Sequence, residues 1–246
     1  MKIVMLWFTL FLSHFLYAKE KVTAYTYYDF QPFVIDTKQQ TGLIYDFASL
    51  LSKLSHGKYH FSVRYIPRKR LDKHLMTGNY EIVIFAYPLW FGDGEKIKYL
   101  WSDPIIPDEN AIISHKSKPF EFESMESFRG VSIIGILGHR FFSDKDYKYY
   151  DINVIAEAPN WPAAIKMVNS NRADIGIMSM ASTKYLLKEM NVPNIYLSKK
   201  PPYTFGHCIF TNPQLKKLHQ FILDVTKNIK ENNEWNKILK KYHLSS

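Results

Sequence analysis

A glycine-rich loop with three aromatic residues is the part of this chain whose residue types point most directly to binding chemistry. Residues 87–94 read YPLWFGDG, and the charged pair Glu95 and Lys96 follows immediately. The rings of Tyr87 and Trp90 can stack on an apolar or cationic group, and the two charges can meet a polar ligand. The loop contains too much glycine and charge for a core strand, so we expect Trp90 to line a binding cleft.

Two further rings follow the first predicted strand, and a third opens a predicted helix. Tyr28 and Phe30 stand at the end of a β-rich segment, and Trp161 follows Pro159 and Asn160. Single aromatic residues are also common in cores, and Trp161 could instead make a packing contact at a helix start. We predict that all three rings line the same cleft as Trp90.

An anion site is predicted at Gly138, His139 and Arg140. These residues follow a strand-like segment, and we expect the next helix to begin at residues 139–142. Backbone N–H groups at a helix N-terminus attract anions, and Arg140 would add a fixed positive charge. The alternative is that Arg140 faces solvent.

Known catalytic and metal-binding patterns are missing from the sequence. It contains no HExxH, CxxC, GxSxG or GxxxxGK motif, and its histidines are scattered. Cys208 is the only cysteine, which excludes an internal disulfide and a cysteine-based metal site. We therefore predict no catalytic residue, no metal and no cofactor.

The N-terminal residues predict export. Residues 1–18 combine Lys2, an apolar core at 3–12 and a small residue, Ala18, which is typical of a cleaved signal peptide. A membrane anchor is the alternative, but the apolar run is shorter than the roughly 20 residues that span a bilayer. We expect a periplasmic, monomeric protein without stable membrane insertion. The net charge of +9 is dispersed, and because an exported protein does not meet nucleic acid, it indicates a solvated basic surface.

The predicted elements form two α/β units. Strands at 22–28, 61–66 and 81–85 alternate with helical segments at 43–54 and 71–76, which indicates a mostly parallel sheet. A second unit has strands at 131–136, 153–156 and 173–179 with a helix from Trp161 to about Val168. Residues 110–114 are expected to cross between the units, residues 203–210 to return, and residues 213–242 to be helical.

This order of segments resembles family 3 extracellular solute-binding proteins, the periplasmic binding proteins of polar amino acid ABC transporters. The landmarks are QPF at 31–33, TGLIYDFASLLSKL at 41–54, WSDP at 101–104, NSNRADIGIMS at 169–179 and YTFGHCIF at 203–210. The resemblance implies an α/β fold of the two-lobe, type II periplasmic-binding-protein kind. It has two mostly parallel sheets flanked by helices and joined by two crossing strands, with a ligand held between the lobes.

The resemblance also implies the domain boundaries and the partners. The first part of lobe 1 would span residues 19–110, lobe 2 residues 111–203, and the return segment of lobe 1 residues 204–246. A small-molecule ligand and an ABC transporter permease are the implied partners.

The amino acid clamp of the family is not evident in this chain. Its arginine, which binds the ligand carboxylate, falls on Glu95 with Lys96 beside it, and its second-lobe aspartate falls on Ser179. The ten predicted ligand-binding residues are therefore Tyr28, Phe30, Tyr87, Trp90, Glu95, Lys96, His139, Arg140, Trp161 and Ser179. Without the clamp, we expect a small polar or aromatic solute.

Two other functions are compatible with the sequence. The fold resembles periplasmic cyclohexadienyl dehydratases, in which a cleft carboxylate takes part in eliminating water from an aromatic precursor, and Glu95 would be that carboxylate here. A ligand sensor that works through a partner protein, without transport, is the other alternative.

Overall fold

The computed structural model describes residues 19–139 and 141–244. Its strands are β1 (Glu20–Thr26), β2 (Tyr59–Tyr65), β3 (Ile82–Ala86), β4 (Leu100–Trp101), β5 (Ile106–His115), β6 (Ser132–Ile136), β7 (Asn153–Ala158), β8 (Ile175–Ser179), β9 (Ile195–Leu197) and β10 (Thr204–Thr211). Its α-helices are α1 (Leu43–Leu54), α2 (Arg68–Met76), α3 (Asp144–Tyr149), α4 (Trp161–Asn169), α5 (Met180–Met190), α6 (Lys216–Lys227) and α7 (Asn233–Lys241). Short 3₁₀ segments are η1 (Pro88–Phe91), η2 (Met125–Phe128) and η3 (Ile229–Glu231).

Lobe 1 is built on β1, which pairs in parallel with β2 and β3, while β10 runs antiparallel to β3. Helices α1 and α7 cover this sheet, and their contact includes the rings of Phe47 and Trp235, whose centroids lie 5.0 Å apart. The apolar residues of α1 recur at helical spacing, so one face of the helix is buried in the core. Gly42 precedes α1 at φ 132°, and a Cβ there would lie 2.6 Å from the Phe33 carbonyl oxygen, so only glycine fits.

Lobe 2 places β8 between β5 and β6, with β7 at the edge. Helix α4 packs its apolar residues on this sheet, and Ile113, Ile134, Ile165 and Val168 lie in the core between them. Pro162 occupies the first turn of α4, where a missing N–H costs nothing, and the Asn160 side chain caps the helix by accepting from the Ala163 N–H.

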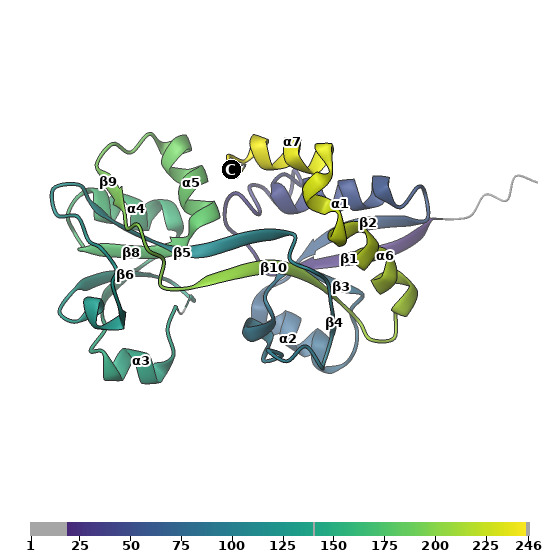
Figure 1. The fold of residues 1–246 in the computed structure, drawn as a ribbon, viewed down its shortest axis with the longest axis horizontal. Helices are drawn as coiled ribbons and strands as arrows, with labels where there is room; N and C mark the ends of the chain where they lie inside the picture. The colour runs from purple at the N-terminus through teal and green to yellow at the C-terminus, as the bar shows by residue number, and fades with distance from the viewer. Residues whose placement is uncertain (1–18, 140, 245–246) are drawn as a thin grey trace, which may run out of the picture.

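Strands β5 and β10 cross between the lobes side by side (Figure 1). They pair antiparallel from Thr204 opposite Glu109 to His207 opposite Ile106. Hydrogen bonding through this pair joins the strands into one path, in the order β2-β1-β3-β10-β5-β8-β6-β7. The predicted architecture of two lobes joined by two crossing strands is confirmed, whereas the boundaries at residues 110 and 203 stay a prediction.

Most of the predicted elements are present, and one prediction was wrong. No helix begins at His139: α3 starts at Asp144, because Ser143 accepts from the Asp146 N–H and caps it there. Helix α5 was not predicted. The helical pattern predicted over 213–242 is divided by η3. Helix α7 then begins at Asn233, and the side chain of the preceding Asn232 caps it.

Residues 1–18, the predicted signal peptide, lie outside the described residues. Within the described part of the chain, no helix is both long and apolar enough to cross a membrane.

Candidate functional site

Three aromatic rings form a wall between η1 of lobe 1 and the crossing strand β10. The ring centroids of Tyr87 and Trp90 lie 5.4 Å apart, those of Trp90 and Phe205 4.9 Å, and those of Tyr87 and Phe205 5.8 Å. Trp90 is 38% exposed, so the wall offers a free ring surface. The sequence prediction named Tyr87 and Trp90, and the structure brings them together.

The short 3₁₀ segment η1 fixes the position of Trp90. Pro88 starts this segment, and Gly92 ends it at φ 59°, a left-handed conformation that glycine adopts readily. Arg68 of α2 donates a hydrogen bond of 2.5 Å to the Trp90 carbonyl, and its guanidinium lies 4.1 Å from the centre of the Phe91 ring. The Trp90 backbone is therefore held from both ends and by α2.

Phe30 is the ring that joins the two lobes. Its centroid lies 4.9 Å from that of Tyr28 in lobe 1, 5.2 Å from Trp161 and 5.6 Å from His139 in lobe 2. It packs against the hydrophobic clusters of both lobes. Tyr28 and Trp161 are buried, so they form the walls behind Phe30. Burial lowers the pKa of His139, and the nearby Asp29 carboxylate partly opposes this. His139 is therefore mostly neutral at neutral pH.

A buried polar network lies where the crossing strands meet the lobes. Asp108 of β5 accepts a hydrogen bond of 3.0 Å from His207 Nε2 of β10, and both side chains are 1% exposed. The other ring nitrogen, His207 Nδ1, lies 3.3 Å from the Tyr28 hydroxyl. Burial raises the pKa of Tyr28 well above its ordinary value, so the phenol keeps its proton and can donate a hydrogen bond to Nδ1.

Asp108 is also bound to lobe 2. Its carboxylate accepts from the Ser179 hydroxyl at 2.6 Å and from the Ala181 N–H at 3.1 Å, at the start of α5. Burial alone would raise the pKa of Asp108. The hydrogen bonds from His207, Ser179 and the Glu109 N–H outweigh burial, so the pKa lies below its ordinary value and the group is ionised.

The backbone beside this network is strained. Phe85 is fully buried near the end of β3, yet its φ is 60°, in the left-handed region that aromatic residues rarely adopt. Its carbonyl oxygen lies 3.4 Å from His207 Nδ1. Strain of this kind persists only where surrounding contacts impose it and tends to occur at functional sites.

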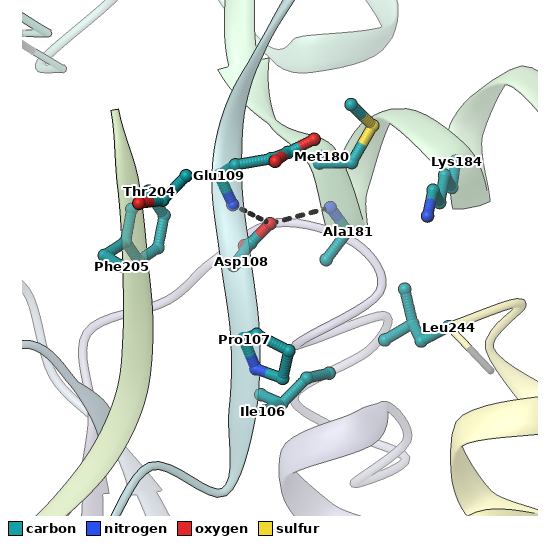
Figure 2. Close-up of a pocket in the computed structure, with 10 residues that line it drawn as sticks. All are labelled: Ile106, Pro107, Asp108, Glu109, Met180, Ala181, Lys184, Thr204, Phe205 and Leu244. Atoms are coloured by element: carbon teal, nitrogen blue, oxygen red, sulfur yellow. Dashed lines mark hydrogen bonds between the residues drawn. The ribbon is translucent and has the colours of Figure 1, made fainter. Parts of the chain in front are cut away.

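A cavity of about 480 Å³ lies beside β5 (Figure 2). The cavity is lined by Ile106, Met180, Lys184 and Leu244. It is also lined by Asp108, from the buried polar network, and by Phe205, from the ring wall. Figure 2 shows the Asp108 carboxylate with its hydrogen bonds to the Glu109 and Ala181 N–H groups. The volume is within the range of small-molecule sites.

Glu95 and Lys96 are exposed, on the loop between η1 and β4. Lys96 is close enough for its charge to act on Cys208, although burial dominates and raises the pKa of that thiol to about 11. The loop is held by Asp93, which accepts from three backbone N–H groups and from Trp101 Nε1.

The other predicted residues have mixed placements. Ser179 caps α5 and binds Asp108, so a carboxylate from β5 stands beside the position where the family resemblance places an aspartate. His139 meets Phe30 and Trp161, but not at a helix start. Arg140 lies outside the described residues. No group of three or more His, Cys, Asp or Glu side chains in the described ranges could hold a metal ion.

Sequence reasoning missed Asp108, His207 and Phe205. Their only signal was position: β10 was predicted as a returning strand, so alternate residues 205 and 207 share one face. The sequence does not predict that β5 lies beside β10 with Asp108 near His207. The register of two strands about 100 residues apart depends on the whole fold and not on local pattern.

No protein-family model matches the chain, and no curated protein matches it. Its structure is similar to an ancestral arginine-binding protein bound to arginine, with a TM-score of 0.70, 18% identity, and coverage of 92% of this chain and 99% of that one. It is also similar to a structure from work on glutathione import in Gram-positive bacteria via GshT and the cystine ABC importer TcyBC of Streptococcus mutans. There the TM-score is 0.70 and the identity 21%, over 93% of this chain and 96% of that one.

A third similar structure is the ancestral amino acid-binding protein AncCDT-1, a precursor of cyclohexadienyl dehydratase. It has a TM-score of 0.64 and 19% identity, over 90% of this chain and 94% of that one. These neighbours are solute-binding proteins, and the chain has their two-lobe fold. The resemblance found in the sequence is confirmed at the level of the fold.

Proposed function

We propose that this protein is a non-enzymatic solute-binding protein that closes two lobes on a small polar or aromatic solute. The observation that carries the proposal is the position of Phe30, whose ring meets rings of lobe 1 and lobe 2 at once. A solute that lies against these rings contacts both lobes only when they are close together. Such a solute shifts the population towards the closed form.

The composition of the walls supports the ligand class. Tyr87, Trp90 and Phe205 present ring surface, and Glu95 and Lys96 are exposed on the loop that follows η1. A free carboxylate or ammonium is costly to bury without an opposite charge. Asp108 already accepts hydrogen bonds from four groups, so its carboxylate is occupied. An aromatic, sugar-like or cationic ligand fits the rings better than a standard α-amino acid.

The cellular role belongs to the same proposal. Residues 1–18 would direct export to the periplasm and be removed there, and the closed, loaded protein would dock on an ABC permease. The structural neighbours from importer systems support this role. A ligand sensor with the same binding step is the alternative, and identifying a partner protein would distinguish the two.

A thermal-shift screen of residues 19–246 tests the proposal. A solute that binds only the folded state raises the unfolding temperature, and ligands with micromolar Kd give visible shifts at millimolar concentration. We expect a shift with aromatic acids, amines or sugars, lost in Trp90→Ala. Tyr149→Ala is the matched control, since this lobe 2 ring is 71% exposed and packs on Tyr150, outside the ring wall. A shift that Trp90→Ala leaves unchanged would overturn the assignment of the wall.

The dehydratase alternative finds no support at Glu95. That residue is exposed on its loop, whereas the cleft carboxylate of a dehydratase would be enclosed with its substrate. Incubation with prephenate or arogenate is the direct check. Turnover that is abolished by Glu95→Gln would establish the enzyme and contradict a purely binding function.

A further inference from the structure

We propose that Asp108 and His207 form a clasp across the hinge that fixes the closed arrangement of the two lobes. In this role they are positioning residues that act on the ligand-binding rings without contacting the solute. The inference rests on the proposed two-lobe function and deepens it, because it names the residues that set the resting hinge angle. We call the pair Asp108 and His207 the hinge clasp.

The hinge clasp connects lobe 1, the two crossing strands and lobe 2 through the Asp108 carboxylate. His207, on β10, contacts lobe 1 through the Tyr28 hydroxyl at 3.3 Å. Asp108, on β5, contacts lobe 2 through Ser179 at 2.6 Å and through the Ala181 N–H at 3.1 Å. The bond of 3.0 Å between them closes this chain of contacts from one lobe to the other.

The bond of the hinge clasp crosses the segment that must bend. On the paired strands Asp108 lies opposite Phe205, and His207 lies opposite Ile106, so the Asp108–His207 bond runs diagonally over the pair. Rotation of one lobe relative to the other changes the backbone angles of these strands, and a diagonal contact is sensitive to that change. Opening therefore lengthens the Asp108–His207 hydrogen bond, or it separates Asp108 from Ser179 or His207 from Tyr28.

Burial makes the loss of the bond costly. Both side chains are 1% exposed, and an ionised carboxylate removed from its hydrogen-bond donors is strongly disfavoured in such surroundings. The carboxylate oxygens are shared among two side-chain and two backbone donors. An open form must replace these bonds with water, so the hinge clasp favours the closed form.

The hinge clasp is also in contact with the ring wall. The centroid of the His207 ring lies 5.3 Å from that of Phe205, 6.0 Å from Trp90 and 5.0 Å from Phe33. A solute that packs against Trp90 and Phe205 therefore contacts rings that themselves pack against His207. Ligand occupancy and the state of the hinge are thereby coupled through packed side chains.

Small-angle X-ray scattering of the ligand-free protein tests the hinge clasp directly. We expect Asp108→Asn and His207→Asn to raise the radius of gyration. The first variant removes the charge and one of the two acceptor oxygens, and the second removes the imidazole that connects Asp108 to Tyr28. Ser179→Ala and Tyr28→Phe remove one outer contact each and should give smaller increases. These milder variants keep the test valid if Asp108→Asn fails to fold.

Asp93→Asn is the matched control. Asp93 is also a buried carboxylate with four donors, but all of them lie in residues 97–101 of lobe 1. It should lower the unfolding temperature and leave the radius of gyration unchanged. An unchanged radius in Asp108→Asn, His207→Asn and both milder variants would overturn the hinge clasp. So would opening caused only by His243→Ala, which breaks the contact of the C-terminal segment with Glu189 of α5.

The failure of this inference and that of the proposed function are distinguishable. The scattering experiment needs no ligand, so an increased radius in the clasp variants stands even if no solute is found. A solute that binds while all clasp variants keep the wild-type radius leaves the binding function intact and removes the clasp. For a solute that binds, a tenfold smaller closed population should raise the apparent Kd about tenfold.

Discussion

At the scale of single residues, three aspartates show how position decides what a carboxylate does. Asp93 organises a loop, Asp108 joins the crossing strands, and Asp174 pairs with Lys118 and Ser132 at the edge of lobe 2. The sequence identified none of them as special, because isolated aspartates carry no spacing signal. It did identify the rings, since Tyr87, Trp90, Phe30 and Trp161 stand at predicted element ends.

Replacing Asp93 by asparagine should destabilise lobe 1 by about 2–3 kcal/mol, because the amide loses charge and meets backbone donors with its own N–H₂ group. Urea unfolding followed by circular dichroism measures this loss. Glu95→Gln, two residues along the same loop and exposed, should change the free energy of unfolding by less than about 0.5 kcal/mol. Equal effects of the two substitutions would show that Asp93 does not hold the loop.

Asp174 should make stability fall in acid. Its hydrogen bond with Lys118 and those from Ser132 lower its pKa from the ordinary 3.8 to about 2. The folded pKa is depressed, so the ionised form contributes stability above pH 3.8, and this is lost as the pH falls towards 2. Asp174→Asn should lack this part of the acid-induced loss in thermal unfolding between pH 5 and 2. A variant with the wild-type pH profile would argue against the contribution.

At the scale of elements, local signals located most strands and helices but not their ends. The bounds of α1 agree with the predicted 43–54, because its apolar face and Gly42 are both local features. The helix expected at 139–142 was wrong, because the capping side chain Ser143 lies further along the chain. Helix α5 was missed because it follows β8 without an intervening loop, so no turn signal marks its start.

Gly42→Ala should destabilise the protein by about 2 kcal/mol or more, since a Cβ would press on the Phe33 carbonyl at a φ of 132°. The loop that turns here carries Phe30, so solute binding should weaken as well. Gly57→Ala is the control: its φ is 88°, but nothing lies within 4 Å of the added Cβ, so the cost is limited to the backbone, about 1 kcal/mol. Chemical denaturation of both variants compares them, and a larger loss in Gly57→Ala would contradict this account of Gly42.

At the scale of the whole molecule, the order of elements predicted two lobes and two crossing strands, and the structure has them. What the order could not supply was the contact between lobes, since that depends on register and on loops far apart in sequence. The ring of Phe30 against Trp161, and Asp108 against His207, both join residues about 100 or more positions apart. The site is therefore a property of the assembled molecule, even though most of its rings were predicted from the sequence.

The most direct test of the account is the Kd, by isothermal titration calorimetry, of the solute that gives the largest thermal shift. It should be measured for the wild type, Trp90→Ala, Phe30→Ala and Lys96→Ala. We predict that the two ring variants bind at least about fivefold more weakly, since loss of a stacked ring costs roughly 1–3 kcal/mol, and that Lys96→Ala binds as the wild type does. Loss of binding in Lys96→Ala with unchanged binding in both ring variants would contradict it.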